Sequence, residues 1–193
     1  MGRIVISTNA TLDGAVQDPD GQEGFERGGW FTSSIGNDRE EWAKLAAQEA
    51  LNASALLLGR RSEAWFAQRW ASRSGDWASR LNTMPKYVVS KSLAVPAWTH
   101  STILKDMNEV AGLKKQANGD VVVYASYLLT QALLEHDLVD EIRLVVFPVV
   151  LGTGRRLFGD SPRGPRLRLA SMRRLGENLG FSIYEVVRGS LAA

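Results

Sequence analysis

Short runs of apolar, largely β-branched residues recur along the chain and predict strands. They occupy residues 3–7, 55–59, 86–90, 120–124 and 141–150. Continuous apolar runs of this kind are typical of strands that are buried on both faces. Two later stretches, residues 165–175 and 180–188, instead alternate polar and apolar residues. That alternation predicts antiparallel strands with one exposed face.

Helical patterns separate these runs. Residues 38–51 place apolar side chains at helical spacing. Residues 106–117 open with Asp106, a residue that favours the start of a helix, and residues 126–137 begin with Ser126 and carry a leucine-rich face. A further helix is expected after the run at 55–59 and the polar residues that follow it.

The order of these elements predicts an α/β fold. Strand–helix alternation followed by two closing strands favours a mostly parallel sheet with antiparallel strands at one edge. The 193 residues suit a single domain, residues 1–193. Because exposed edge strands are rarely left bare, the alternating C-terminal stretches are expected to meet a second copy in a homodimer.

Composition excludes several classes of function. The 23 basic and 21 acidic residues leave a net charge of only +2, so binding of nucleic acid gains little support. The chain has no cysteine, and its two histidines lie far apart. His136 follows an apolar helical run and is interpreted as a helix-end residue. We therefore predict no metal site.

The N-terminal sequence MGRIVIST enters an apolar run directly and lacks the parts of a signal peptide. Ile6 stands where N-myristoylation requires Ser or Thr. No apolar run approaches the length of a membrane-spanning helix. These features predict a cytoplasmic protein that does not bind membranes.

Common nucleotide-binding motifs are incomplete in this chain. Gly152 and Gly154 begin a dinucleotide-binding fingerprint, but Leu157 occupies the place of its third glycine. Gly154 and Gly159 have the spacing of a phosphate loop, yet Asp160 replaces the required lysine. Both motifs are rejected, and no serine nucleophile motif is present.

Polar segments follow four of the predicted strands, at residues 8–10, 59–62, 90–92 and 125–126. If the strands are parallel, these segments meet at one edge of the sheet, where open α/β sheets bind ligands. Arg60, Arg61 and Lys91 supply cations, and two of the segments enter helices whose first N–H groups attract anions. A solvated rim is the alternative, but together the segments favour a site for a phosphorylated ligand.

Five blocks of sequence carry a resemblance to a known superfamily. They are TLDG (11–14), LLLGRRSEAW (56–65), KYVVSKSL (86–93), VVVYASYLLTQALLEHDLVDEIRL (121–144) and FPVVLGTGRRLF (147–158). In this order they resemble the dihydrofolate reductases. Within that superfamily they are similar to the reductase domain of the bifunctional riboflavin-biosynthesis deaminase–reductase and to its single-domain bacterial relatives.

The resemblance implies a three-layer fold, with helices flanking a mixed and mostly parallel sheet, and NADPH as hydride donor. Residues expected to hold the cofactor phosphates are Gly59, Arg60, Arg61 and Ser62 in one turn, and Ala125, Ser126 and Tyr127 in a second. Ser90 and Lys91 would meet the adenosine end, where a cation neutralises the 2′-phosphate. Asn9 and Ala10 would flank the nicotinamide, with the candidate catalytic residue Asp13 nearby.

Two segments are candidates for substrate contacts. Trp30 or Phe31 would supply an aromatic wall from the glycine-rich segment 18–31, unless that segment is an ordinary surface loop. Gly152 and Gly154 would line the active site, unless they only form a tight connection.

Two features depart from the superfamily pattern. Ala125 stands where relatives commonly have glycine, and its methyl group is expected to hinder positive φ or close cofactor approach. Asp38, Glu40 and Glu41 are available as a helix carboxylate, but acidic residues also favour helix N-termini in general. Reduction of folate itself is therefore disfavoured.

The sequence thus predicts an NADPH-dependent reductase acting on a small heterocyclic or carbonyl substrate, with the proton supplied by solvent or by an acid such as Asp13. One alternative is the riboflavin-pathway reductase, which reduces a ribosyl to a ribityl chain on an aminouracil phosphate. A second alternative is a nucleotide-binding but catalytically inactive module.

Overall fold

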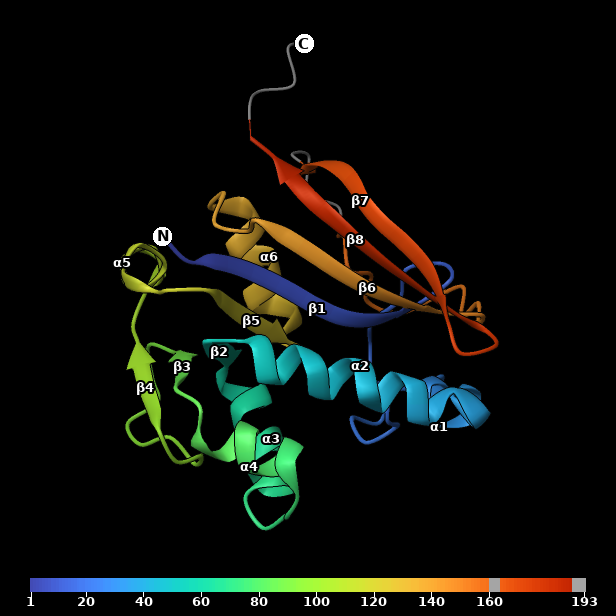
Figure 1. Cartoon of the computed structure of the whole chain (residues 1–193), viewed down its shortest axis with the longest axis horizontal. Coiled ribbons are helices and arrows are strands. Elements are labelled where there is room, and N and C mark those ends of the chain that lie inside the picture. The colour runs from blue at the N-terminus through green and yellow to red at the C-terminus, as the bar shows by residue number, and fades with distance from the viewer. Residues whose placement is uncertain (160–163, 189–193) are drawn as a thin grey trace. The chain divides into compact units, whose positions relative to one another are not determined.

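The computed structural model describes residues 1–159 and 164–188. Its strands are β1 (Arg3–Thr11), β2 (Ala55–Gly59), β3 (Lys86–Val89), β4 (Ser101–Leu104), β5 (Asp120–Tyr124), β6 (Glu141–Phe147), β7 (Arg166–Leu175) and β8 (Leu179–Val187) (Figure 1). Its α-helices are α1 (Trp30–Ser34), α2 (Arg39–Asn52), α3 (Arg60–Trp70), α4 (Asp76–Thr83), α5 (Met107–Gln116) and α6 (Tyr127–Glu135), and a 3-10 helix, η1, covers Gly36–Asp38.

The strands hydrogen-bond in the order β4-β3-β2-β5-β1-β6-β8-β7. β2 pairs in parallel with β3 and with β5, and β3 pairs in parallel with β4. β8 pairs antiparallel with β6 and with β7. The predicted α/β fold, with a mostly parallel sheet and antiparallel C-terminal strands, is confirmed.

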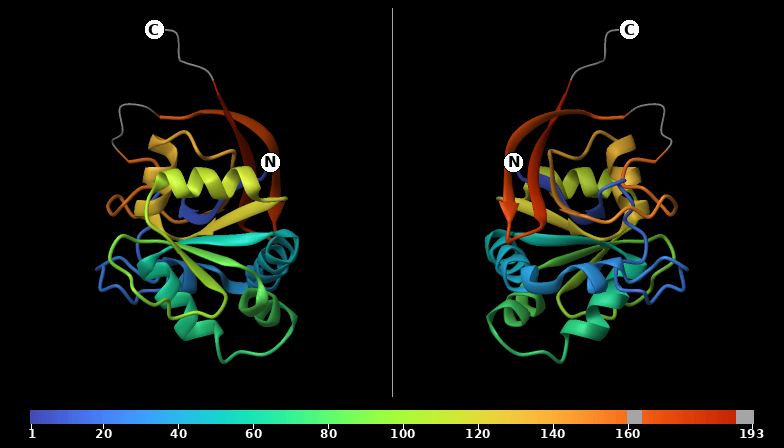
Figure 2. Two further views of the ribbon diagram at one scale, coloured as in Figure 1. Left: turned by 90° about the vertical axis from the view of Figure 1, so that its left-hand side faces the viewer. Right: turned by 90° about the vertical axis from the view of Figure 1, so that its right-hand side faces the viewer.

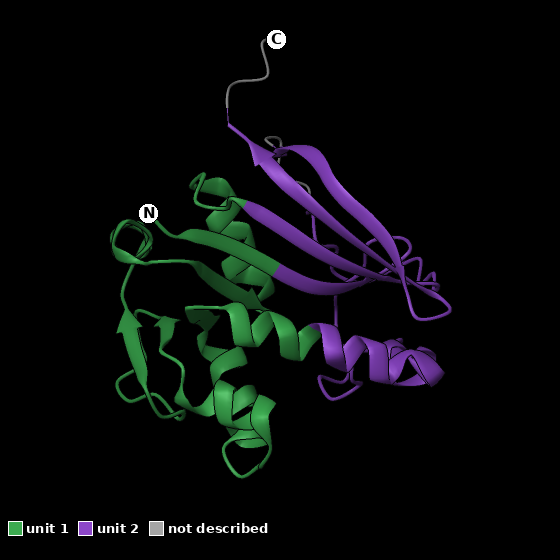
Figure 3. Ribbon diagram, viewed as in Figure 1, with its two compact units in different colours: residues 1–6, 46–140 green, residues 7–45, 141–193 purple. Residues whose placement is uncertain are grey.

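Contacts divide the chain into two compact units (Figure 3). Unit 1 comprises Met1–Ile6 and Ala46–Asp140, and unit 2 comprises Ser7–Leu45 and Glu141–Ala193. β1 and α2 each run through both units, so neither boundary falls in a linker. The single domain expected from chain length stays a prediction.

Helices cover both faces of the unit 1 strands. α3 and α4 lie on one face, and α5 and α6 lie on the other (Figure 2). The apolar run of β2 explains this arrangement, because successive side chains of a strand point to opposite faces. Leu56 and Leu58 join the core beneath α3 and α4 together with Trp98, and all three are at most 3% exposed.

A buried lysine closes the end of α4. Lys86, the first residue of β3, is 1% exposed, and its Nζ donates to the carbonyl oxygens of Asn82 (3.0 Å) and Met84 (2.9 Å). The ammonium group also lies 4.5 Å from the ring centroid of Trp98. Burial lowers the pKa of Lys86 from 10.5 to about 8, because desolvation penalises the charged form.

Unit 2 has its own aromatic core on one face of β6 and β8. Trp30 and Phe31 pack against Phe147 with centroids 5.5 and 5.2 Å away, and Phe31 meets Trp42 edge-on at 4.9 Å. The side chain of Asp38 closes the turn between β7 and β8: it accepts hydrogen bonds from the N–H groups of Glu177 (2.5 Å) and Asn178 (3.0 Å).

Some predicted boundaries were wrong. β1 continues past Ser7 to Thr11, because Ala10 and Thr11 are buried and continue the strand. β6 stops at Phe147, since the following residue, Pro148, has no N–H to donate to a ladder. α1, α4 and β4 were not anticipated; they are five, eight and four residues long, too short for a clear periodic pattern.

Candidate functional site

The turn from β2 into α3 presents uncapped backbone donors. Gly59 has an extended backbone (φ −78°, ψ 159°), and α3 begins at Arg60 without a side-chain capping hydrogen bond. A Cβ at Gly59 would meet its nearest atom, Ser126 Oγ, at 3.8 Å, so the fold itself leaves room there. The first N–H groups of α3 are thus left to bind water or an anion.

The turn from β5 into α6 is joined to this first turn. Ala125 and Ser126 both have a left-handed backbone, with φ of 50° and 59°. Ser126 occupies the N-cap position of α6, as predicted, but its hydroxyl forms no capping bond. Instead Ser126 Oγ accepts a hydrogen bond from the N–H of Gly59 at 3.0 Å. This bond places two helix N-termini side by side.

The segment after β3 adjoins the first turn. Arg60 Nη1 donates to Ser92 Oγ at 3.4 Å. Ser90 Oγ accepts from the N–H of Leu93 at 3.1 Å, which shapes the turn that carries Lys91. Because β2 is parallel to β3 and to β5, the three predicted segments lie at the carboxyl edge of the unit 1 strands.

α5 provides a contrast within unit 1. Its N-cap residue, Asp106, accepts hydrogen bonds from the N–H groups of Asn108 (2.8 Å) and Glu109 (3.0 Å). A carboxylate therefore already occupies the anion position of α5, whereas neither α3 nor α6 has such a side-chain cap.

The exposed side chains of Arg60, Arg61 and Lys91 add positive charge beside α3. Ser62 in α3 and Tyr127 in α6 occupy the first helical turns and are half-buried.

In unit 2, backbone hydrogen bonds fasten the segment after β1 to residues 149–157. The N–H of Leu12 donates to the carbonyl of Val149 (2.8 Å), and the N–H of Leu157 donates to the carbonyl of Gly14 (2.9 Å). Ala15 also forms a β-bridge with Arg156. The structure thereby brings the predicted residues of the TLDG segment together with those of the 152–154 turn.

Asp13 is the anchor of this arrangement. Its carboxylate accepts hydrogen bonds from Thr11 Oγ1 (2.6 Å) and from the N–H groups of Leu151 (3.2 Å) and Gly152 (2.9 Å). Arg156 Nη2 lies 3.7 Å away. The hydrogen bond from Thr11 and those from the backbone lower the pKa of Asp13 to about 2. Asp13 is therefore an anion at neutral pH, which suits it to position the turn better than to donate a proton.

The glycines of the turn differ in their surroundings. Gly152 and Gly154 have φ of 72° and 96°, which favours glycine at both positions. A Cβ on Gly152 would meet nothing within 4 Å, whereas one on Gly154 would lie 3.1 Å from Phe25 Cζ. Phe25 belongs to the segment 18–31, whose Arg27 donates to the carbonyl of Leu151 at 2.5 Å. The turn is therefore covered by that segment near Gly154 and open at Gly152.

The segment 18–31 folds around a buried carboxylate. Asp18, which is 1% exposed, accepts hydrogen bonds from the N–H groups of Gln22 (2.7 Å), Glu23 (3.0 Å) and Phe25 (3.1 Å). Trp30 is only 3% exposed, and its Nε1 donates to the carbonyl of Gln17 at 2.9 Å. Its burial opposes the predicted substrate contact and makes Trp30 a core residue.

Asn9 and Ala10 lie inside β1, where the strand was expected to have ended. Ala10 is 1% exposed, so its side chain is packed in the protein interior. Asn9 is half-buried, and its Oδ1 accepts a hydrogen bond from Trp42 Nε1 at 3.0 Å. The sequence did not predict this pair, because the helical spacing of residues 38–51 does not specify which strand residue Trp42 meets.

The candidate helix carboxylates have structural partners. Asp38 is 2% exposed and bonded to the β7–β8 turn, and Glu40 pairs with Lys44 at 2.8 Å on the surface of α2. Glu41 pairs with the same lysine at 2.9 Å. The contacts of Glu40 and Glu41 agree with the interpretation that acidic residues favour the start of a helix, whereas the bond of Asp38 to the β7–β8 turn was not predicted.

Two further observations concern metal ligands and membrane spans. Within residues 1–159 and 164–188, no three histidine, aspartate or glutamate side chains gather as metal ligands would. Over the same residues, no helix combines the length and the apolar composition needed to cross a membrane. His136 is the C-cap residue of α6, and its Nδ1 lies 2.8 Å from the carbonyl oxygen of Ala132.

Solved structures share the fold over nearly the whole chain. A protein of Shewanella sp. PV-4 provisionally assigned to riboflavin biosynthesis superposes with a TM-score of 0.72 and 19% identity, covering 96% of this chain and 99% of the other. A pyrimidine reductase-like protein of Corynebacterium diphtheriae gives a TM-score of 0.62 and 14% identity, with 97% and 92% coverage. The uncharacterized protein YyaP of Bacillus subtilis is 24% identical over 196 residues, covering 94% of each chain.

The strand order, the antiparallel C-terminal pair and the linked helix N-termini define an α/β protein of the dihydrofolate reductase-like class. The sequence model of the RibD C-terminal domain matches residues 3–181. The chain belongs to the RibD C-terminal domain family.

Proposed function

We propose that this protein is an NADPH-dependent reductase whose substrate is a small heterocyclic or carbonyl compound. The observation that carries the proposal is the hydrogen bond between Gly59 N–H and Ser126 Oγ. It joins two helix N-termini that have no side-chain cap, beside the cations of Arg60, Arg61 and Lys91. A pyrophosphate has the negative charge and the acceptor oxygens that such a pair of helix ends attracts.

The donor set fits NADPH in particular. Arg60 and Arg61 would bind phosphate oxygens in the first turn, with Ser62, Ala125, Ser126 and Tyr127 completing the cradle. Lys91, next to Ser90, would neutralise the 2′-phosphate that distinguishes NADPH from NADH. When bound, NADPH supplies the hydride.

The residues of unit 2 would orient the reacting groups. Asn9 and Ala10 would flank the nicotinamide, and the open position at Gly152 would leave room for a substrate. Asp13 would hold the 151–152 turn as an anion, so the proton that accompanies the hydride would come from solvent. This division of roles matches a reaction that depends on positioning and not on a protein nucleophile.

A second candidate is the aminouracil phosphate reductase of riboflavin biosynthesis. Membership of the RibD C-terminal domain family favours it, and the fold is shared with a pyrimidine reductase-like protein. A catalytically inactive nucleotide-binding module is less favoured, because Ala125 already has the positive φ that its methyl group was expected to hinder.

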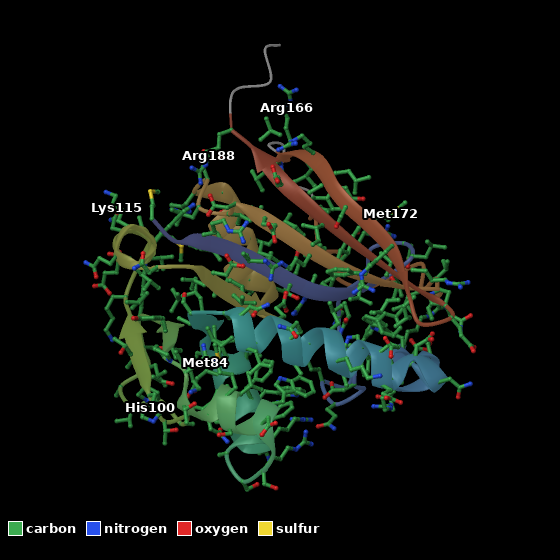
Figure 4. All side chains as sticks on the ribbon, viewed as in Figure 1. Met84, His100, Lys115, Arg166, Met172 and Arg188 are labelled. Carbon is green, nitrogen blue, oxygen red and sulfur yellow. The ribbon has the colours of Figure 1, made fainter. Side chains whose placement is uncertain are left out.

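Calorimetric titration with NADPH and then NADH tests the proposal. We expect saturable binding of NADPH that is at least tenfold tighter than that of NADH, and a tenfold to hundredfold loss in Arg60→Ala, the cost of about one or two charge-assisted hydrogen bonds. Lys115→Ala is the matched control: Lys115 is an exposed cation of α5 in the same unit (Figure 4), and its removal should leave affinity unchanged. If neither NADPH nor NADH binds, the proposal that the protein is a reductase is refuted.

Consumption of NADPH with a panel of substrates then separates the candidates. A pyrimidine-pathway reductase should oxidise NADPH with the aminouracil phosphate and not with simple aldehydes or ketones. The broader reductase should accept other carbonyl or heterocyclic compounds. Tight NADPH binding without turnover on any of them would favour the inactive module.

A further inference from the structure

The hydrogen bond between Trp42 and Asn9 determines which way the Asn9 side chain points. Trp42 Nε1 lies 3.0 Å from Asn9 Oδ1. An indole N–H is a donor only, so the atom facing it must be the amide oxygen and not the nitrogen. The NH₂ group of Asn9 is therefore turned away from Trp42, and this orientation follows from chemistry even though oxygen and nitrogen are alike in size.

Packing holds Trp42 in place. Its ring meets Phe31 edge-on, with centroids 4.9 Å apart, and it lies against the core of unit 2. Trp42 comes from α2 and Asn9 from β1, both within the part of unit 2 that precedes residue 46. The donor is thus a rigid side chain, which favours a single orientation of the amide over two.

The NH₂ group of Asn9 has no protein acceptor among the described residues, although the side chain is half-buried. A partly buried amide donor without a partner costs free energy unless water or a ligand accepts its hydrogen bond. The group it can bind is an acceptor, and a carbonyl oxygen in the plane of the amide gives the best geometry.

We propose that Trp42 is a positioning residue that fixes the Asn9 amide, so that Asn9 Nδ2 donates a hydrogen bond to the carboxamide oxygen of the nicotinamide ring. The inference rests on the proposed function, in which Asn9 flanks that ring, and adds the direction of the bond and the residue that enforces it. Trp42 itself would not touch the cofactor. The alternative is a purely structural role, in which the Trp42–Asn9 bond only holds α2 against β1. In that case changes to either residue would leave the affinity for the cofactor unchanged.

Two probes separate the nicotinamide from the rest of the cofactor. NADPH is compared by calorimetry with 2′-phospho-ADP-ribose, which keeps the phosphates and the adenosine but lacks nicotinamide. In Asn9→Asp the bond from Trp42 is retained while the donor becomes an acceptor. We expect NADPH affinity to fall tenfold or more and the affinity of the fragment to change less than twofold. Asn9→Ala, which introduces no charge, should show the same selective loss.

Trp42→Phe tests the positioning role, because phenylalanine keeps the aromatic packing and removes the N–H. The freed amide can turn over, so NADPH affinity should fall about threefold to tenfold, again with the fragment unaffected. A carboxylate has two equivalent oxygens and no orientation to lose. Adding Trp42→Phe to Asn9→Asp should therefore cost no further NADPH affinity, a non-additivity that a purely structural role would not produce.

The outcomes distinguish this inference from the proposed function. If the unaltered protein binds neither NADPH nor the fragment, the proposed function fails. The second case is that the unaltered protein binds both NADPH and the fragment. In that case the inference alone is overturned if Asn9→Asp and Asn9→Ala weaken the two affinities equally, or weaken neither. Near-ultraviolet circular dichroism of each variant shows whether the aromatic core is intact.

Discussion

The backbone at Ala125 and Ser126 is unusual, because both residues have a left-handed conformation without being glycine. Such a conformation costs about 1 kcal/mol or more for a residue with a Cβ. The side chain of Ala125 is exposed, so its methyl group collides with nothing that would exclude the conformation. The strain is therefore tolerated between the end of β5 and the start of α6.

Replacing Ala125 by glycine should release part of that strain. We expect Ala125→Gly to stabilise the protein by about 0.5–1 kcal/mol in urea denaturation, since relief of the left-handed penalty exceeds the added entropy of the unfolded chain. Ala132→Gly, within α6, is the control and should destabilise by about 1 kcal/mol. A loss of stability in both variants would contradict the strain at Ala125.

Asp13 contributes to stability only as an anion. Its pKa is about 2 in the folded protein against 3.8 in the unfolded chain, so the contribution is complete above pH 3.8 and is lost as the pH falls toward 2. We expect Asp13→Asn to destabilise by about 2 kcal/mol at pH 7 and to flatten the pH dependence of stability below pH 4. Denaturant unfolding at several pH values measures both effects, and equal losses at pH 7 and pH 2 would refute the assignment.

Residue identities and strand order predicted where several candidate site residues lie, but not the contacts between them. Gly59, Arg60 and Lys91 were expected at the end of parallel strands, and they lie there. The Trp42–Asn9 bond joins residues 33 positions apart in sequence and depends on how α2 packs, which the local pattern does not contain.

At the scale of elements, the apolar runs predicted strands most accurately where they are sharply bounded. The bounds of β2 and β5 agree with the sequence prediction, because polar residues or turn residues stand at both ends. β4 was missed since its four residues, STIL, are too few to establish an alternating pattern. The extension of β1 was missed because Thr8 and Asn9 were interpreted as a polar loop.

The β7–β8 hairpin depends on a carboxylate from another element. The carboxylate of Asp38 accepts hydrogen bonds from the N–H groups of Glu177 and Asn178 in the turn. These hydrogen bonds, above all that from Glu177, hold the pKa of Asp38 below its ordinary value. Because the folded pKa is depressed, this contribution is present above pH 3.8 and disappears as the pH falls below it.

Asp38→Asn should therefore loosen the hairpin at neutral pH. We expect a loss of about 2 kcal/mol, because the amide cannot accept as strongly from two N–H groups. Amide hydrogen exchange at Glu177 and Asn178 should accelerate. Glu40→Gln, which alters only an exposed ion pair on α2, is the control and should leave exchange in the hairpin unchanged. Slow exchange in Asp38→Asn would contradict the role of the carboxylate.

At the scale of the whole molecule, β7 is the outer strand of the sheet and is exposed along most of its length. Its register on β8 places Leu167, Leu169 and Met172 on one face, opposite Val186, Tyr184 and Ser182. Leu169 is 50% exposed and Met172 71%, and Figure 4 shows Met172 on β7. An exposed apolar face on an edge strand is the kind of surface that a second copy would cover.

We therefore expect a homodimer that uses this face of β7. Light scattering should give twice the mass of one chain, and Met172→Glu should reduce it to the mass of a monomer because a buried charge without a partner opposes association. Val95→Glu changes a similarly exposed apolar residue of unit 1 and is the control, which should keep the mass of the dimer. A monomeric mass for the unaltered protein would overturn the prediction.

The division into two units was not visible in the sequence. Domain boundaries are usually sought in linkers of distinct composition. Here β1 and α2 cross from one unit to the other without interruption. Their apolar patterns are continuous, so nothing along the chain marks the crossing.

The buried amine of Lys86 has a chemical consequence. With a pKa near 8, a large share of this amine is in the nucleophilic free-base form in mildly alkaline solution, whereas an ordinary lysine is almost entirely protonated. At 1% exposure, however, no acylating reagent can reach it in the closed protein. Acylation of Lys86 therefore requires the core between β3 and α4 to open, and its rate relative to that of an exposed lysine would report how often this opening occurs.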